Sequence, residues 1–229
     1  MTFRFGVVEL MSKYAIRESD MAEELTESTM KKTLNFAYDK AVNGVGVLDS
    51  AQELAESYMN NNDTKFEQVN ALIRWQNTQA GTLGFLTGIG GLIVMPVTLP
   101  TNITSVLYIQ IRMIASIVYI AGYDVKDDKV KTIIFACLVG NGAKELIKNA
   151  GIQIGKKIAT NTIKNISGKV ITQINQKVGF RLITKFGEKG VINLGKAVPV
   201  LGGIIGGTVD VISTNTVGNT ARNIFIGKK

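Results

Sequence analysis

The sequence predicts an all-α protein, a compact multi-helix bundle with glycine-rich apolar helical hairpins. Over residues 18–42 apolar residues recur at intervals of three to five, which is the spacing of one helix face. A run of 37 residues, from Trp75 to Ile111, contains no Asp, Glu, Lys or Arg and is rich in glycine. Pro96 and Pro100 interrupt this run, and proline is tolerated in the first turn of a helix but not in its interior.

The N-terminal part of the chain predicts two short helices. Residues 18–42 have helical spacing with a polar face, which is typical of a surface helix. Residues 42–46 break this pattern, and Asp49 or Ser50 can cap a second helix over about residues 51–59. We expect residues 1–62 to be a helical appendage to a domain that spans residues 63–229.

The uncharged run predicts a helical hairpin. Gly84 and Gly88 lie on one helix face and allow another backbone to approach closely, in a bilayer or in a soluble bundle. The two prolines should end this arm and start the next near Thr101. The second arm, residues 103–119, is apolar all round except for Gln110 and Arg112.

Arg112 is the most diagnostic residue of the second arm. An arginine near the middle of an apolar helix costs several kcal/mol in lipid unless it snorkels or pairs. We therefore expect Arg112 inside the bundle, held by a partner such as Asp124 or Glu145. This makes a bilayer-spanning hairpin less favoured and leaves shallow insertion open.

The acidic residues after the second arm are expected to cap a helix. Asp127 or Asp128 can cap a helix that runs through Leu138 to Asn141 and Glu145. The spacing of these acids does not match a calcium-binding loop, so we expect no metal there.

The charge is uneven along the chain. Residues 126–229 hold 17 of the 26 Lys and Arg and 5 of the 18 Asp and Glu, a net charge of +12. Four cations in this half recur at every fourth residue and form what we call the basic stripe: Lys177, Arg181, Lys185 and Lys189. On a helix the stripe is either a solvated face or a surface that docks on anionic headgroups. The residues expected to contact membrane or lipid are Gly84, Gly88, Leu92 and the basic stripe.

The C-terminal region predicts a second close-packing helix over residues 198–207, ended by Asp210. Asn215, Asn219 and Arg222 follow on one helix face and suggest a buried hydrogen-bond network. The expected members of this network are Arg112, Asp124, Asn141, Glu145, Asn219 and Arg222.

Composition makes an enzyme the weakest prediction. The chain contains no histidine, the commonest general base and zinc ligand. No phosphate-binding loop, nucleophile elbow or zinc spacing is found, so no cofactor is expected. Catalysis through Asp124, Lys144 or Glu145 ranks last. The lone Cys137 and the absence of a secretion signal pattern favour a cytoplasmic location.

Several segments resemble the EcsC protein family over roughly residues 65–226. The matching segments are residues 84–92, 95–100, 112–115, 122–124, 139–141, 179–182, 187–190 and 203–207. The family is bacterial, takes its name from an operon that includes an ABC transporter, and has no established enzymatic activity. The resemblance implies an all-helical, membrane-associated accessory role. Many members carry an acid between the two prolines, where this chain has Thr98.

Three functions fit the sequence. The first is a non-enzymatic accessory protein, peripheral to the inner membrane face, that binds anionic lipid or a membrane protein complex. The second is a soluble helical module that binds a lipid or other hydrophobic ligand, and the third is a toxin or defence effector that permeabilises membranes. Nucleic acid is not expected as a partner, because the basic half lacks surface aromatics and any nucleic-acid-binding motif. An oligomer remains open.

Overall fold

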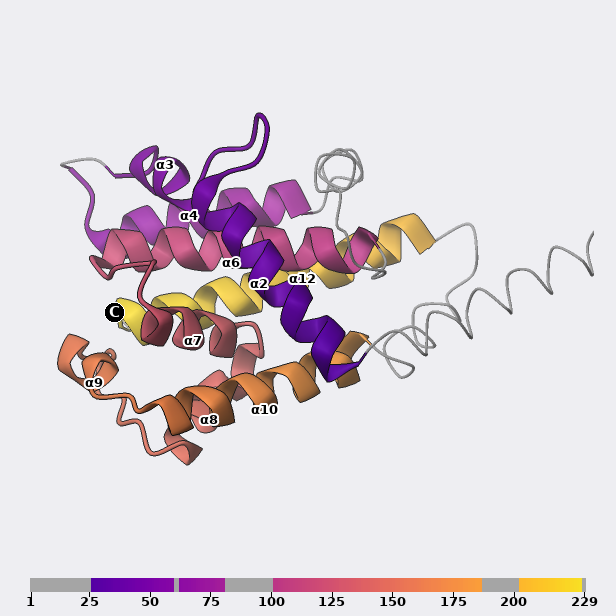
Figure 1. Cartoon of the computed structure of the whole chain (residues 1–229). Coiled ribbons are helices and arrows are strands. Elements are labelled where there is room, and N and C mark those ends of the chain that lie inside the picture. The colour runs from indigo at the N-terminus through magenta and orange to yellow at the C-terminus, as the bar shows by residue number, and fades with distance from the viewer. Residues whose placement is uncertain (1–25, 60–61, 81–100, 187–201, 228–229) are drawn as a thin grey trace, which may run out of the picture.

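The computed structural model describes residues 26–59, 62–80, 101–186 and 202–227 (Figure 1). Over these residues the chain is helical and contains no strand, apart from an isolated bridge between Val45 and Leu48. The all-α prediction is confirmed. In order, the helices are α2 (Glu27–Asn43), α3 (Ala51–Glu56), α4 (Lys65–Ala80), α6 (Thr101–Ala121), α7 (Asp128–Cys137), the 3-10 turn η1 (Gly140–Gly142), α8 (Ala143–Asn149), α9 (Thr160–Lys164), α10 (Gly168–Phe186) and α12 (Gly202–Phe225).

Helix α6 is the centre of the bundle. It packs against α2, α3, α4, α7 and α12, and Figure 1 shows it between these helices. Its side chains are buried from Ile103 to Val118. A helix that is covered on all sides must be apolar all round. The composition of residues 103–119 therefore follows from the position of α6 in the bundle.

Local capping sets the ends of the first two helices. The Thr26 hydroxyl accepts a hydrogen bond from Thr29 N at 3.1 Å and starts α2. Ser50 and Glu53 form a capping box at the start of α3, so Ser50 is the cap that the sequence offered. Gly44 follows α2 with a φ of 80°, a left-handed value that favours glycine.

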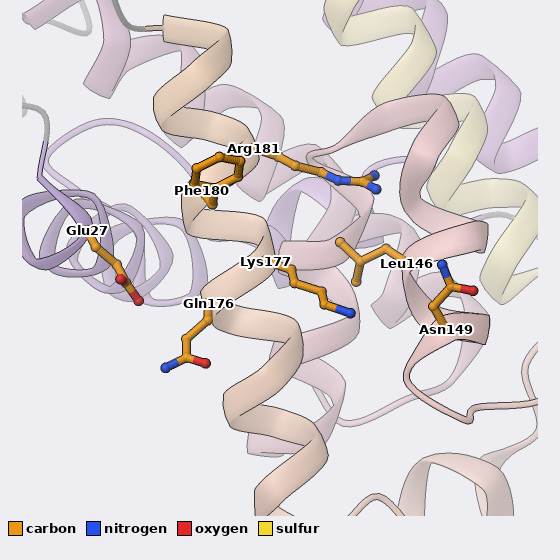
Figure 2. A pocket seen from close by; sticks show the side chains of 7 residues that line it. All are labelled: Glu27, Leu146, Asn149, Gln176, Lys177, Phe180 and Arg181. Atoms are coloured by element: carbon orange, nitrogen blue, oxygen red, sulfur yellow. The ribbon is translucent and has the colours of Figure 1, made fainter.

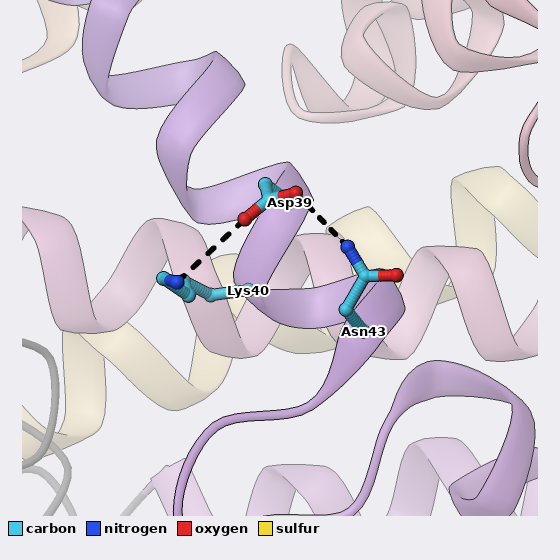
Figure 3. A network of polar contacts seen from close by, with 3 residues as sticks. All are labelled: Asp39, Lys40 and Asn43. Atoms are coloured by element: carbon cyan, nitrogen blue, oxygen red, sulfur yellow. Dashed lines mark hydrogen bonds and ion pairs between the residues drawn. The ribbon is translucent and has the colours of Figure 1, made fainter.

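The last turn of α2 carries a small exposed network (Figure 3). Asn43 Nδ2 donates to Asp39 Oδ1 at 2.9 Å, and Lys40 Nζ lies 3.7 Å from Asp39 Oδ2. Exposed ion pairs of this kind contribute little to stability, about 0–1 kcal/mol. We therefore assign this network a local role at the end of α2.

Helices α2 and α3 belong to the same hydrophobic core as α6. Met30, Leu34 and Leu54 are buried in one cluster with residues of α6, α7 and α12. Helices on both sides of the expected boundary between residues 62 and 63 therefore contribute to one core.

Two helix boundaries differ from the prediction. Asp127 caps α7 as expected, but the helix does not continue into Asn141. Gly140 has a φ of 67°, which an α-helix cannot contain, so η1 and α8 start a new direction. Asp210 does not end a helix either, because α12 runs from Gly202 to Phe225 without a break.

Helices α4, α6, α10 and α12 share one end of the bundle. Helices α4 and α10 end there, and α6 and α12 begin there (Figure 1). A polar junction of Asn77, Gln110, Lys185, Ser213 and Asn215 ties these four helices together. Asn77 Nδ2 donates to Asn215 Oδ1 at 3.0 Å, Gln110 Nε2 to Ser213 Oγ at 3.3 Å, and Lys185 Nζ to Ser213 Oγ at 2.8 Å.

Candidate functional site

Helix α10 carries three members of the basic stripe. Its apolar face buries Ile174, Val178 and Leu182 against the bundle. Lys177 and Arg181 are exposed on another face of the helix. Lys189 lies outside the described residues, as do Gly84, Gly88 and Leu92.

Lys177 and Arg181 line a cleft between α8 and α10. The α8–α10 cleft has a volume of 520 Å³ and is lined by Glu27, Leu146, Asn149, Gln176, Lys177, Phe180 and Arg181. In Figure 2 the side chains of Lys177 and Arg181 point from α10 toward α8, and Glu27 lies on the other side of α10. The cleft thus collects two cations and one carboxylate.

The Arg181 guanidinium is held by the turn before α8. Its Nη1 donates to the carbonyl oxygen of Gly142 at 3.3 Å. A Cβ at Gly142 would lie 2.5 Å from this nitrogen, closer than two such atoms can approach. Because Gly142 has no side chain, the Arg181 guanidinium can lie against residue 142 in the wall of the cleft.

Phe180 presents an aromatic ring to solvent next to these two cations. It is 70% exposed, although large aromatic side chains are usually buried in soluble domains. Trp75, on α4, is 51% exposed. Aromatic rings beside cations suit the boundary between water and lipid, where the ring contacts acyl chains and the cations contact headgroups.

Lys185 departs from the basic stripe. Its ammonium group turns to α12 and donates to Ser213 in the polar junction. The stripe therefore divides by role: Lys177 and Arg181 face the cleft, and Lys185 joins α10 to α12. Regular spacing along the sequence did not reveal this division, because it depends on the position of α12.

The six residues expected to form a buried network are not brought together. Arg112 is buried, 5% exposed, as expected. Asp124, Asn141 and Glu145, however, are exposed. The end of α6 lies about 13 Å from Arg112 along the helix axis, at the usual helical rise. Asp124, which follows α6, is therefore too far away to pair with Arg112.

Arg112 is instead held by the segment that leads into α3. Its Nη1 donates to the carbonyl oxygen of Asp49 at 3.3 Å, and its guanidinium carbon lies 5.6 Å from the centre of the Tyr108 ring. Burial raises the pKa of Tyr108, and the charge of Arg112 partly opposes this rise. A backbone carbonyl and an aromatic face thus take the place of the expected carboxylate.

Arg222 and Asn219 lie on α12 but in separate contacts. Arg222 Nη1 donates to Asn70 Oδ1 at 2.5 Å, and its guanidinium lies 4.8 Å from the Phe66 ring. Burial lowers the pKa of Arg222. Asn219 donates to Asn215 Oδ1 at 2.9 Å and so extends the polar junction.

Only a weak signal for the polar junction is present in the sequence. Gln110 is the one amide side chain in the apolar second arm, residues 103–119, and Asn215 marks a polar stripe. Their meeting could not be predicted, because Gln110 and Ser213 are about a hundred residues apart in the chain. Gln76 Oε1 and Gln110 Oε1, on α4 and α6, are buried and accept no hydrogen bond.

The groups considered for catalysis come from different segments of the described structure. Within residues 26–59, 62–80, 101–186 and 202–227, no group of three or more His, Cys, Asp or Glu is placed to hold a metal ion. Asp124 and Glu145 are exposed residues on different segments. Burial raises the pKa of the Cys137 thiol, which makes it a poor nucleophile.

One described helix is long and apolar enough to cross a membrane. It is the part of α6 from Ile103 to Ala121, and 94% of its most apolar window is buried inside the bundle. Length and composition of this kind are shared by core helices of soluble proteins. The finding is therefore weak evidence for a membrane span.

The fold and the site define a class of protein: an all-α bundle with a cationic cleft near the end at which α4 and α10 end and α6 and α12 begin. The chain belongs to the EcsC protein family, whose model matches residues 6–226. The match includes α2 and α3 and extends beyond the resemblance over residues 65–226. Neither the curated proteins nor the solved structures include a significant match.

Proposed function

We propose that this EcsC family protein is a non-enzymatic accessory protein that binds the inner face of an anionic bilayer. The glycine-rich end of the bundle would contact the apolar part of the bilayer, and the α8–α10 cleft would contact headgroups. Its location would then be cytoplasmic and peripheral to the membrane. A membrane protein complex is a further partner that fits this location.

The observation that carries this proposal is the common end of four helices. The end of α4 and the start of α6 flank residues 81–100, and both lie at the same end of the bundle as the start of α12 (Figure 1). Residues 81–100 contain five glycines and no Asp, Glu, Lys or Arg. Apolar segments joined to the same end of a bundle can meet a bilayer together, which segments joined to opposite ends could not do.

Charge supports the same orientation. Lys177 and Arg181 lie on α10, the helix that ends at the polar junction, and Phe180 is exposed on the same helix. A cation near an anionic membrane contributes about 1 kcal/mol, so this pair contributes about 2 kcal/mol, or a factor of about 30 in affinity. Polar lining of the cleft favours a headgroup over an acyl chain as its contact.

Flotation with lipid vesicles tests the proposal. Purified protein is mixed with phosphatidylcholine vesicles, with or without phosphatidylglycerol, at low and high salt. We expect binding only to the anionic vesicles, with a part that survives high salt because apolar contacts are not screened. A protein that floats with neither type of vesicle would contradict the proposal.

A pair of double variants separates the cleft from general charge. Lys177→Ala with Arg181→Ala should lose most of the salt-sensitive binding. Lys164→Ala with Lys169→Ala removes the same charge from exposed positions outside the cleft. If both double variants lose binding equally, the cleft has no special role and net charge alone attracts the protein.

A further inference from the structure

Two aromatic rings are exposed on the described helices, and an arginine is next to each. Trp75 on α4 is 51% exposed and follows Arg74, and Phe180 on α10 is 70% exposed and precedes Arg181. Both arginines are exposed as well. We call these two pairs, Arg74–Trp75 and Phe180–Arg181, the aromatic belt. Both pairs lie on helices that end at the shared end of the bundle (Figure 1).

The two rings of the aromatic belt lie at about the same level of the bundle. Asn77 follows the α4 ring by two residues and donates to Asn215 of α12. Lys185 follows the α10 ring by five residues and donates to Ser213, two residues nearer the start of α12. At about 1.5 Å per residue, these contacts place both rings within roughly one helical turn of the same distance from the shared end. Two rings at one level can enter the surface of a bilayer together.

The helices carry few charges between the aromatic belt and the shared end. Helix α4 has no charged residue after Arg74, and α6 has none before Arg112. Residues 182–186 of α10 and residues 202–215 of α12 carry one each, Lys185 and Asp210. The Lys185 ammonium group already donates to the hydroxyl of Ser213. Charged groups are the costliest to move from water into a bilayer, so their scarcity favours contact with lipid beyond the belt.

The exposed uncharged polar side chains described beyond the belt form hydrogen bonds within the protein. Thr78 Oγ1 donates to the carbonyl oxygen of Arg74 at 3.1 Å, and Thr184 Oγ1 donates to that of Phe180 at 3.0 Å. Asn215 Oδ1 accepts hydrogen bonds from two other asparagines. A hydroxyl that is bonded to the preceding turn of its own helix needs no water, and in lipid such internal partners are required. These bonds support a lipid contact at this end.

We propose that the aromatic belt marks the level at which the bundle meets the bilayer surface, and that Arg74 and Trp75 form a second lipid contact, separate from the α8–α10 cleft. The rings of Trp75 and Phe180 lie between the headgroups and the acyl chains, and the two arginines contact lipid phosphate. This inference rests on the proposed membrane function and adds a contact surface on α4 and an orientation. Contacts on α4 and α10 together hold the shared end against the bilayer.

Tryptophan fluorescence tests the inference, because Trp75 is the only tryptophan of the chain. The full-length protein is mixed with vesicles of phosphatidylcholine and phosphatidylglycerol whose acyl chains carry bromine, a quencher, either near the headgroup or near the chain middle. We expect emission at shorter wavelength and stronger quenching by the shallow bromine. Unshifted emission from protein that floats with these vesicles, or stronger quenching by the deep bromine, would overturn the inference and leave the membrane function intact. Protein that does not float would overturn both.

A double variant moves the reporter to the other helix of the belt. Trp75→Phe with Phe180→Trp keeps an aromatic ring at both positions and places the single tryptophan on α10. Because both positions are exposed, the melting temperature should stay near that of the wild type. We expect the same shift in emission and the same preference for the shallow bromine. A response on only one of the two helices would show that the rings do not share a level in the bilayer and would overturn the inference.

Affinity gives a second measurement that does not depend on fluorescence. Trp75→Ala should float with phosphatidylglycerol vesicles about tenfold more weakly, because the ring no longer leaves water on binding. Met59→Ala is the matched control: Met59 is 46% exposed, and it follows α3, whose Glu56 contacts Tyr119 near the far end of α6. Both variants should keep the wild-type melting temperature. Wild-type affinity in Trp75→Ala, or an equal loss in both variants, would overturn the contact on α4.

Discussion

Gly142→Ala should disable the cationic cleft without unfolding the protein. The new Cβ would lie 2.5 Å from Arg181 Nη1, so the guanidinium must move by roughly an ångström to reach ordinary contact distance. That movement breaks the 3.3 Å hydrogen bond to the Gly142 carbonyl. Arg181 is exposed and has a flexible side chain, so it can move without disturbing the core.

The expected effect on stability is close to zero. Gly142 has a φ of −78°, which alanine adopts readily, and Val139 Cγ1, 3.2 Å from the new Cβ, must shift by a few tenths of an ångström. A compatible Gly→Ala change contributes about 0.4–1 kcal/mol by restricting the unfolded chain. The lost hydrogen bond of an exposed arginine costs about the same. The melting temperature should therefore change little.

The expected effect on binding is larger. A cation near an anionic membrane contributes about 1 kcal/mol, which corresponds to about a fivefold change in affinity. We expect Gly142→Ala to bind phosphatidylglycerol vesicles up to about fivefold more weakly at low salt, measured by flotation over a range of lipid concentrations. Gly168→Ala is the control, because no atom lies within 4 Å of its new Cβ.

Three results would refute the reasoning. If Gly142→Ala binds vesicles with wild-type affinity while Arg181→Ala binds weakly, the Arg181 guanidinium contacts lipid from a position other than the one beside Gly142. Equal loss in Gly168→Ala would show that the effect comes from the α8 to α10 region in general. A marked fall in the melting temperature would show that the turn at Gly142 cannot accept a side chain.

Three further predictions concern stability and reactivity. Gly218→Ala should destabilise the fold by about 1–3 kcal/mol in denaturant unfolding, because its Cβ would lie 3.0 Å from Ile73 Cγ1 and 3.1 Å from Met113 Cε. Hydrogen bonds from the Ser50 backbone and hydroxyl hold the pKa of Glu53 below its ordinary value of 4.5. The stability from this cap is therefore present above pH 4.5 and is lost as the pH falls through the lower folded-state pKa. The difference in urea midpoint between wild type and Glu53→Gln should accordingly close in acid. Cys137 is fully buried, so iodoacetamide should modify it only in denaturant, as measured by mass spectrometry.

Features set by short-range interactions could be predicted from the sequence. Ser50 and Asp127 cap α3 and α7 through hydrogen bonds to backbone groups two or three residues away. Helix α6 begins at Thr101, directly after Pro100, as the restriction on proline predicts. In each case the partner is close in the sequence, so the residue type and its position were sufficient.

Features set by tertiary contacts could not be predicted. The partner of Arg112 is a backbone carbonyl 63 residues away, and a carbonyl has no signature in the sequence. Lys185 continues the four-residue spacing of Lys177 and Arg181, but its ammonium group donates a hydrogen bond to Ser213 of α12. The continuity of α12 through Asp210 reflects the same limit, because an acid can end a helix or remain within it according to its surroundings.

The central place of α6 bears on how deeply the protein enters a membrane. The helix is long enough to span a bilayer, but Ser116 Oγ donates to the carbonyl of Ala51 at 2.8 Å, and Arg112 bonds the carbonyl of Asp49. Both contacts join α6 to the start of α3. Moving α6 into lipid would break them and place the charge of Arg112 in an apolar medium, which costs several kcal/mol.

We therefore expect α6 to remain in the bundle when the protein binds vesicles. Hydrogen exchange measured by mass spectrometry can test this, because amides of a buried core helix open only with global unfolding. Protection of α6 and of α3 should be the same with and without phosphatidylglycerol vesicles. If α3 loses its protection on vesicles while α6 keeps it, α6 has left the bundle for the lipid. That outcome would favour a membrane-permeabilising protein over a peripheral accessory protein, because α3 is stable only while α6 covers it.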